Sequence, residues 1–366
     1  MTTNPVVISP APSIRRKWLR PAISGAVSLA LVVGIFWFFI PQFTSMSKVW
    51  TEIRAMTGLE MATLALAAVW NLATYLFVMV GATPGLKYRQ AFVATETSTA
   101  VSNTIPGGGA LGIALTYSMF GSWGFSRSRT SVSLVVAGIW NNFVKLGMPV
   151  LALSLLALQG KPSGGRIVAA AIGLGALVAA VVALAALLGS EATARKLGLF
   201  AAGVANRLLR AAGRPPVDGW DRATVKFRGR TELLVSARWL WITVTTLISH
   251  LSLFLVLLLA LRHIGVSAQD VGWIEALAVF SFARLLTAIP ITPGGLGVVE
   301  VALITGLVAA GGARAQVAAA VLLFRGLTYV IPIPVGLATY LYYKRNRSWR
   351  REPGAAPRTV LVPESA

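Results

Sequence analysis

The sequence predicts an all-α polytopic membrane protein with about six transmembrane helices and two re-entrant helical hairpins, arranged as inverted-topology repeats. Three observations lead to this fold class. Of the 366 residues, 56% are hydrophobic and 12% are charged, and several apolar runs reach the roughly 18–20 residues that span a bilayer. Two apolar segments are interrupted by proline and glycine, and basic residues are concentrated between alternate spans. Hairpin arms included, we expect eight or more helical membrane segments.

The later interruption lies within residues 284–300, where Pro290, Pro293 and three glycines break an apolar segment. Proline removes a backbone donor and glycine weakens a helix, so a continuous helix is not expected here. At bilayer depth a broken backbone is tolerated only beside protein or a water-filled cavity. We therefore expect a re-entrant hairpin over 273–310. A matching hairpin is expected over 91–123, with its proline-glycine apex 187 residues earlier in the chain.

The remaining apolar runs divide the chain into tails, spans and two halves. A basic tail over 1–21 precedes a membrane domain over 22–343, and a second tail occupies 344–366. The expected spans are 22–40, 60–81, 131–159, 167–189, 239–261 and 315–343. Repeat one (22–159) and repeat two (160–343) each contain two spans, a hairpin and a span. Each repeat crosses an odd number of times, so the second must be inverted.

Charge supports this topology. The net charge is +21, and 24 Lys and Arg residues fall in segments expected in the cytoplasm, against 6 in segments expected outside. The positive-inside bias explains this better than nucleic-acid binding, and it places both termini in the cytoplasm. The cytoplasmic segment 190–238 is the most basic, and its apolar residues recur at helical spacing. It is either an interfacial basic helix on anionic headgroups or a solvated linker.

Each apex begins a returning helix, whose amino terminus favours an anion such as a lipid phosphate. Glycines there either admit a ligand to the backbone or allow tight helix packing, and both interpretations stay open. No cysteine and only two histidines occur, so a metal centre is not expected, and neither is a cofactor. The P-loop, H-E-x-x-H and G-x-S-x-G motifs are absent, so ATP hydrolysis by this chain is not expected.

Five ionisable residues fall within apparent membrane segments, where a charge needs a partner or water: Glu96, Lys145, Arg284, Glu300 and Arg325. The 187-residue offset puts Arg284 beside the equivalent of Glu96, which predicts a Glu96–Arg284 ion pair. Glu300 either caps its helix and neutralises Arg325, or moderates a site in which Arg325 and Lys145 hold a lipid phosphate. Four further residues are expected to form interhelical hydrogen bonds: Asn71, Asn141, Asn142 and His250.

The string Thr-Pro-Gly-Gly-Leu-Gly-Val-Val-Glu over 292–300, followed by Phe324-Arg325, resembles the flippase-like transmembrane region of lysylphosphatidylglycerol synthases. This resemblance implies a bacterial plasma-membrane protein that translocates phospholipids, and it carries over the Pro-Gly-Gly apex, Glu300 and Arg325. Together with the residue-level reasoning, it gives these expected substrate-binding residues: Pro106, Gly107, Gly108, Gly109, Lys145, Arg284, Pro293, Gly294, Gly295, Gly297, Glu300 and Arg325.

Two departures from that family matter. Only 23 residues follow the last expected span, so the aminoacyltransferase domain of full synthases is not predicted. Many relatives carry an acidic residue and an arginine soon after the first apex, whereas Gly109–Leu115 carries neither. We therefore expect a non-enzymatic lipid translocator whose partners are phospholipids with anionic headgroups. The alternative is a membrane scaffold that docks a partner enzyme through 190–238. A membrane-embedded transferase is disfavoured because acidic residues are few, and the sequence does not predict the oligomeric state.

Overall fold

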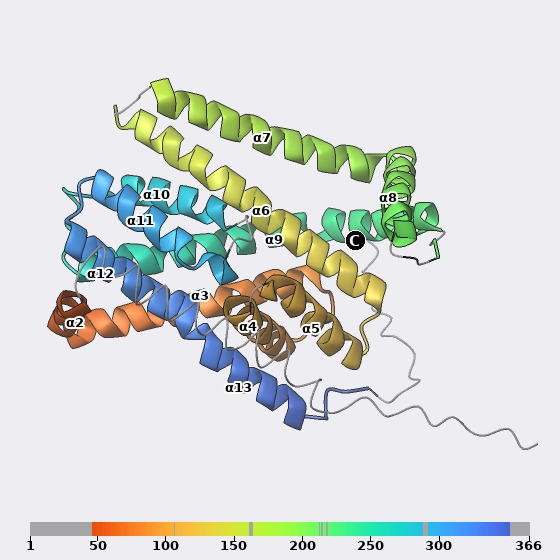
Figure 1. The fold of residues 1–366 in the computed structure, drawn as a ribbon, viewed down its shortest axis with the longest axis horizontal. Helices are drawn as coiled ribbons and strands as arrows, with labels where there is room; N and C mark the ends of the chain where they lie inside the picture. The colour runs from red at the N-terminus through yellow and green to blue at the C-terminus, as the bar shows by residue number, and fades with distance from the viewer. Residues whose placement is uncertain are drawn as a thin grey trace, which may run out of the picture.

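The computed structural model describes residues 46–105, 107–160, 164–211, 213, 215–216, 219–287 and 292–351. Within these ranges the regular structure is helical throughout and no strand occurs, so the protein is an all-α polytopic membrane protein (Figure 1). The first expected span, 22–40, lies outside the described residues, as does Pro106 at the first apex.

The described residues include five helical segments long and apolar enough to cross a membrane. They confirm the second to sixth expected spans: α3 (Gly58–Ala82), α6 (Arg127–Leu158), α7 (Gly164–Gly189), α9 (Trp220–His263) and the segment Arg314–Arg345. The short helix α2 (Met46–Ala55) precedes α3. Local sequence sets where α3 begins, because Thr57 Oγ1 accepts from the Glu60 amide at 3.3 Å while Glu60 Oε2 accepts from the Thr57 amide at 2.7 Å.

The last span contains a π-helical turn that positions a buried tyrosine. It consists of α12 (Arg314–Arg325), the π-helix η3 (Gly326–Val330) and α13 (Pro332–Arg345). Pro332 has no amide proton, so the normal hydrogen-bond ladder cannot continue through it. The ladder widens instead, and the Ile331 amide donates to the Gly326 carbonyl five residues back at 2.9 Å. Tyr329 lies in this turn and is 2% exposed.

Both proline-glycine segments form pairs of short helices. The first hairpin consists of α4 (Tyr88–Thr104) and α5 (Gly108–Ser122). The second consists of α10 (Trp273–Leu286), the 3-10 turn η2 (Pro293–Gly295) and α11 (Val298–Ala309). Helices of 12 to 17 residues rise only about 18–26 Å, less than the roughly 30 Å of bilayer hydrocarbon. A single arm is therefore too short to cross, as expected for a hairpin.

Helices of each half pack on helices of the other half. Helix α3 packs on α9, which is its counterpart in the second half. Helix α4 of the first hairpin packs on α13, and α10 of the second hairpin packs on α6. This reciprocal pairing is what inverted repeats related by a pseudo-twofold axis predict. It brings the apical turn η2 of the second hairpin against α4 of the first hairpin.

The basic segment 190–238 is helical over most of its length. Helix α8 (Glu191–Ala211) lies across the end of α7 and packs on α9, and α9 itself begins at Trp220 (Figure 1). The solvated-linker interpretation is therefore wrong. At 1.5 Å per residue, the 44 residues of α9 extend about 66 Å, so its basic first half continues well beyond the apolar span.

Two apolar cores lie on either side of a polar middle layer. The α10–α11 core includes Phe280, Leu303 and Phe324, and the α4–α5 core includes Val93 and Phe120. Helices α3, α6 and α9 contribute residues to both cores. Between its two contributions each of these helices carries a polar residue: Asn71, Asn141 and His250, respectively. The candidate site lies at this polar layer.

Candidate functional site

The second apex is stabilised by a buried ion pair. Arg325 Nε donates to Glu300 Oε1 at 2.6 Å, and the side chains are 8% and 13% exposed. Glu300 Oε2 accepts from the Gly297 amide at 2.7 Å, so the carboxylate also caps the first turn of α11. Arg325 further donates to the Gly294 carbonyl at 3.4 Å. Of the two interpretations of Glu300, the geometry is that of the helix cap and arginine partner, and its own carboxylate lies where an anion was expected.

Tyr329 joins the second apex to the first hairpin. Its hydroxyl lies 2.5 Å from the Asn103 backbone carbonyl and 3.1 Å from the Pro293 carbonyl, and the Asn103 side-chain Nδ2 donates to the Tyr329 carbonyl at 3.1 Å. The Arg325 guanidinium lies 4.4 Å from the centre of the Tyr329 ring. Gly294 allows this approach: its φ is +57°, and a Cβ there would meet the Tyr329 ring and lie 2.9 Å from Asn103 Oδ1.

A polar cavity of about 650 Å³ opens between the first hairpin, α3, α6, α9 and α10. It brings together three of the predicted ionisable residues, Glu96, Lys145 and Arg284, with His250 beside them. Lys145 and Arg284 interact as like charges, and so do Arg284 and Arg325. A cavity of this size falls within the range of small-molecule and headgroup sites.

The cavity collects buried polar atoms that have no protein partner. Among the described residues, six buried side-chain nitrogen or oxygen atoms lack a hydrogen bond, and four belong to residues that line this cavity. These four atoms are Thr95 Oγ1, Glu96 Oε2, His250 Nδ1 and Arg284 Nε. Buried polar groups are normally paired, so this concentration marks a place where a polar ligand or water completes the hydrogen bonds.

The ion pair predicted between Glu96 and Arg284 is not formed in this structure. Both side chains line the cavity, but none of the salt bridges among the described residues joins them within 4.0 Å. The reason is the packing of their helices: α4 is held against α13, whereas α10 is held against α6. The 187-residue offset identified residues of one site, but it did not determine the direction of their side chains.

The predicted polar contacts in the middle layer are mostly interhelical. Asn71 donates to Ser252 on α9 at 2.8 Å, and His250 Nε2 lies 2.9 Å from Asn141 Oδ1 on α6, as expected. Asn142 instead donates to Gly138 in its own helix at 2.9 Å, so that part of the prediction is wrong.

The predicted binding glycines have different surroundings at the two apices. Pro293, Gly295 and Gly297 are buried at the second apex, whereas Gly107 precedes α5 as its N-cap, with a φ of +70° and no neighbouring atom within 4 Å of an added Cβ. The Gly108 backbone packs on Val101 of α4, which matches the packing interpretation. Gly109 lines the cavity.

Sequence reasoning missed two parts of the site. Tyr329 carried no signal beyond its position four residues after Arg325. The signal for the hydroxyl-bearing wall of α4 is the Thr- and Ser-rich stretch 95–104 in the sequence. In the structure this wall contributes four hydroxyl residues to the cavity: Thr95, Ser98, Thr99 and Ser102.

A family model described as Lysylphosphatidylglycerol synthase TM region matches residues 25–336. The chain belongs to this family. The match includes both hairpins, the Glu300–Arg325 pair and every residue that lines the polar cavity. No curated protein matches the chain.

This member of the lysylphosphatidylglycerol synthase transmembrane family has an uncharged first apex. No charged residue lies between Gly109 and Leu115. The α5 wall of the cavity is formed by Gly109, Ile113 and Thr116. The carboxylate of this hairpin comes instead from Glu96, on the arm before the apex.

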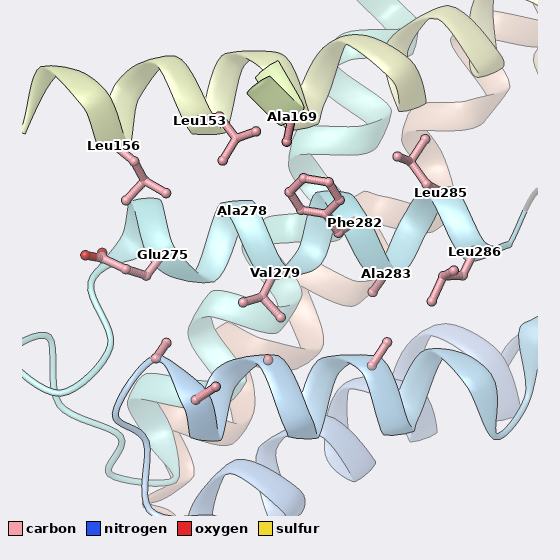
Figure 2. Close-up of a pocket in the computed structure, with 14 residues that line it drawn as sticks. Leu153, Leu156, Ala169, Glu275, Ala278, Val279, Phe282, Ala283, Leu285 and Leu286 are labelled. Atoms are coloured by element: carbon pink, nitrogen blue, oxygen red, sulfur yellow. The ribbon is translucent and has the colours of Figure 1, made fainter. Parts of the chain in front are cut away.

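An apolar groove of about 750 Å³ lies beside the second hairpin, between α6, α7, α10 and α11 (Figure 2). Leu153 and Leu156 of α6 point toward α10, the Phe282 ring of α10 points toward Ala169, and Glu275 lies at one end (Figure 2). Glu275 is the single ionisable residue among those that line the groove. The groove shares Ala283 with a small cavity of about 50 Å³ that contains Arg284 and Arg325. Polar and apolar binding surfaces therefore meet on α10.

Proposed function

We propose that this protein is a non-enzymatic lipid translocator that moves a polar or anionic phospholipid, or a lipid-linked substrate, between leaflets. The observation that carries the proposal is the polar cavity between the two hairpins, with its four unpartnered buried atoms. Membership of the lysylphosphatidylglycerol synthase transmembrane family supports a role in lipid handling.

The charges of the site favour a phosphate. Glu300 neutralises Arg325, which leaves Lys145 and Arg284 against the single carboxylate of Glu96. Neither Lys145 nor Arg284 forms a salt bridge among the described residues, although a charge at membrane depth needs a partner. A phosphate oxygen can accept from both side chains in charge-assisted hydrogen bonds.

An amphiphile fits the arrangement better than a free anion. The apolar groove adjoins the small cavity beside Arg284, which in turn shares Leu253, Arg284 and Thr328 with the polar cavity. A lipid with its headgroup near Arg284 could place an acyl chain along the leucines and Phe282 of the groove (Figure 2).

We further propose that the protein lies in the bacterial inner membrane with both termini in the cytoplasm. The 24-to-6 distribution of Lys and Arg supports this orientation. Helix α8 would then lie at the cytoplasmic surface, with Arg207 and Arg210 near anionic headgroups.

The test is leaflet exchange of acyl-labelled phosphatidylglycerol in proteoliposomes. We expect Lys145→Ala and Arg284→Ala to slow exchange about tenfold or more, because each removes a charge-assisted hydrogen bond to the phosphate. Lys226→Ala is the matched control, since Lys226 is exposed on α9 away from the cavity. Absence of exchange by the wild type across several lipids would reject the translocator, as would undiminished exchange by both folded cavity variants.

A second candidate function is a scaffold that docks a partner enzyme. The observation that favours it is the exposed apolar side of α8, which includes Phe200 (70% exposed) and Leu208 (68% exposed) beside basic residues. Substitution of both residues by serine would abolish partner capture and leave lipid exchange intact if α8 docks a protein. An isolated α8 peptide that binds anionic vesicles, and loses this binding when both residues are replaced by serine, would instead indicate a lipid-facing helix.

A further inference from the structure

Glu96 is the most unusual charged residue of the cavity. It lies in the middle of α4, is 2% exposed, and its Oε2 atom has no hydrogen-bond partner. It lines the polar cavity. No salt bridge among the described residues involves it. A buried carboxylate in a membrane segment is costly unless a positive group or a proton accompanies it.

The helix that carries Glu96 is held firmly in place. A Cβ at Gly336 of α13 would meet the Glu96 carbonyl, so the two backbones are in direct contact. Beside this contact, Thr97 Oγ1 lies 3.1 Å from Thr339 Oγ1. The close packing of α4 on α13 fixes where the Glu96 side chain begins. Helix packing therefore fixes the Glu96 backbone at the cavity, and the carboxylate forms no salt bridge with Lys145 or Arg284 there.

The two signs of charge come from different walls. Glu96 lies among the hydroxyls of Thr95, Ser98, Thr99 and Ser102 on α4, all of which can accept hydrogen bonds. The cations Lys145 and Arg284 come from α6 and α10, and they interact with each other as like charges. The cavity therefore has a wall suited to a positive group and two cations suited to a negative group, without an ion pair between them.

We infer that the cavity selects a zwitterionic phospholipid with one phosphate and one primary amine, and that Glu96 is the residue that binds the amine. The inference rests on the proposed lipid-translocating function. The phosphate binds Lys145 and Arg284, and the ammonium group donates to the Glu96 carboxylate and the neighbouring hydroxyls of α4. A primary ammonium has three donors, whereas a trimethylammonium group has none, so a choline headgroup cannot replace it.

The test compares exchange of acyl-labelled phosphatidylethanolamine, phosphatidylcholine and phosphatidylglycerol in the same proteoliposomes. We expect the wild type to exchange the ethanolamine lipid about tenfold faster than the choline lipid. Glu96→Gln should remove most of this preference while changing exchange of phosphatidylglycerol less than about twofold. Glu96→Asp should retain part of the preference. Glu191→Gln, which alters an exposed glutamate of α8, is the matched control.

The results separate three claims: the amine selectivity, the role of Glu96 and the lipid-translocating function. Equal exchange of all three lipids by the wild type overturns the amine selectivity while leaving the translocator intact. A Glu96→Gln variant that keeps the preference, or that slows all lipids alike, removes Glu96 from recognition of the amine. Absence of exchange for every lipid in the wild type rejects the proposed function and the inference together. Should Glu96→Gln fail to fold, the comparison of lipids in the wild type and the Glu96→Asp result still decide.

Discussion

The two hairpins have the same architecture but satisfy their polar groups in opposite ways. In the second hairpin, Glu300 accepts from the α11 amino terminus and from Arg325, so the apex provides its own anion and its own cation. In the first hairpin, no charged residue follows the apex, and the buried oxygens of Thr95 and Glu96 have no partner. The second apex is therefore complete without a ligand, whereas the first hairpin exposes unsatisfied groups to the cavity. The difference therefore lies at the apices, because each hairpin also contributes an unpartnered buried group to the cavity: Glu96 from α4 and Arg284 from α10.

The largest expected loss of stability comes from removing the ion pair of the second apex. Arg325→Ala leaves the Glu300 carboxylate buried without its cation, which should lower the free energy of unfolding by about 3–5 kcal/mol. Denaturation in mixed detergent micelles measures this change. The double variant Arg325→Ala/Glu300→Gln should recover part of the loss because it removes the unpaired charge. A single variant as stable as the wild type would show that the ion pair does not hold the apex together.

Smaller losses of stability are expected from alanine substitutions at the two apical glycines, Gly294 and Gly107, and they should differ in size. Gly294→Ala should lower the free energy of unfolding by about 2–4 kcal/mol, since its Cβ meets the Tyr329 ring and its φ is positive. Gly107→Ala has a positive φ but no atom within 4 Å of the Cβ, so about 1 kcal/mol is expected. The same micelle denaturation compares them. Equal losses would mean that the second apex is no more tightly packed than the first.

The link between the apices predicts a further effect. Tyr329→Phe removes the hydroxyl that lies against the Asn103 and Pro293 carbonyls, and leaves two buried acceptors without it. The expected loss in unfolding free energy is about 1–3 kcal/mol. Tyr342→Phe, at an exposed tyrosine of α13, is the control. Hydrogen exchange should rise at both apices in Tyr329→Phe, and a rise at one apex alone would contradict a shared link.

The smallest expected effect on stability concerns the unpartnered carboxylate. Glu96→Gln removes a buried charge that has no protein partner, so the free energy of unfolding should not fall and should rise by about 1 kcal/mol. Glu300→Gln should lower it by roughly 3 kcal/mol, because Arg325 is left unpaired. Similar losses in both variants would show that Glu96 is as structurally engaged as Glu300.

Five of the six predicted spans and the two hairpins could be predicted because hydropathy and the two proline-glycine breaks are local properties of the chain, and the first span stays a prediction. The residues of the site could also be named in part, since Lys145, Arg284 and Glu96 are charges in apolar segments. The arrangement of these residues in the site could not be predicted. Which cation pairs with which carboxylate depends on helix rotation, so the sequence permitted a Glu96–Arg284 pair that packing does not form. The role of Tyr329 depends on a π-helical turn. Pro332 indicates a break in the helix, but that the ladder widens before it is seen only in the structure.

The most direct measurement is the thermal shift that phosphatidylethanolamine causes in detergent-solubilised protein, compared between two variants. A ligand that binds the folded state raises its stability in proportion to the logarithm of concentration over Kd. We expect the shift to disappear in Lys145→Ala and to persist in Arg325→Ala/Glu300→Gln, where the second apex has lost its ion pair but the cavity residues remain. A shift that persists in Lys145→Ala and disappears in the double variant would place the lipid at the second apex and contradict the account.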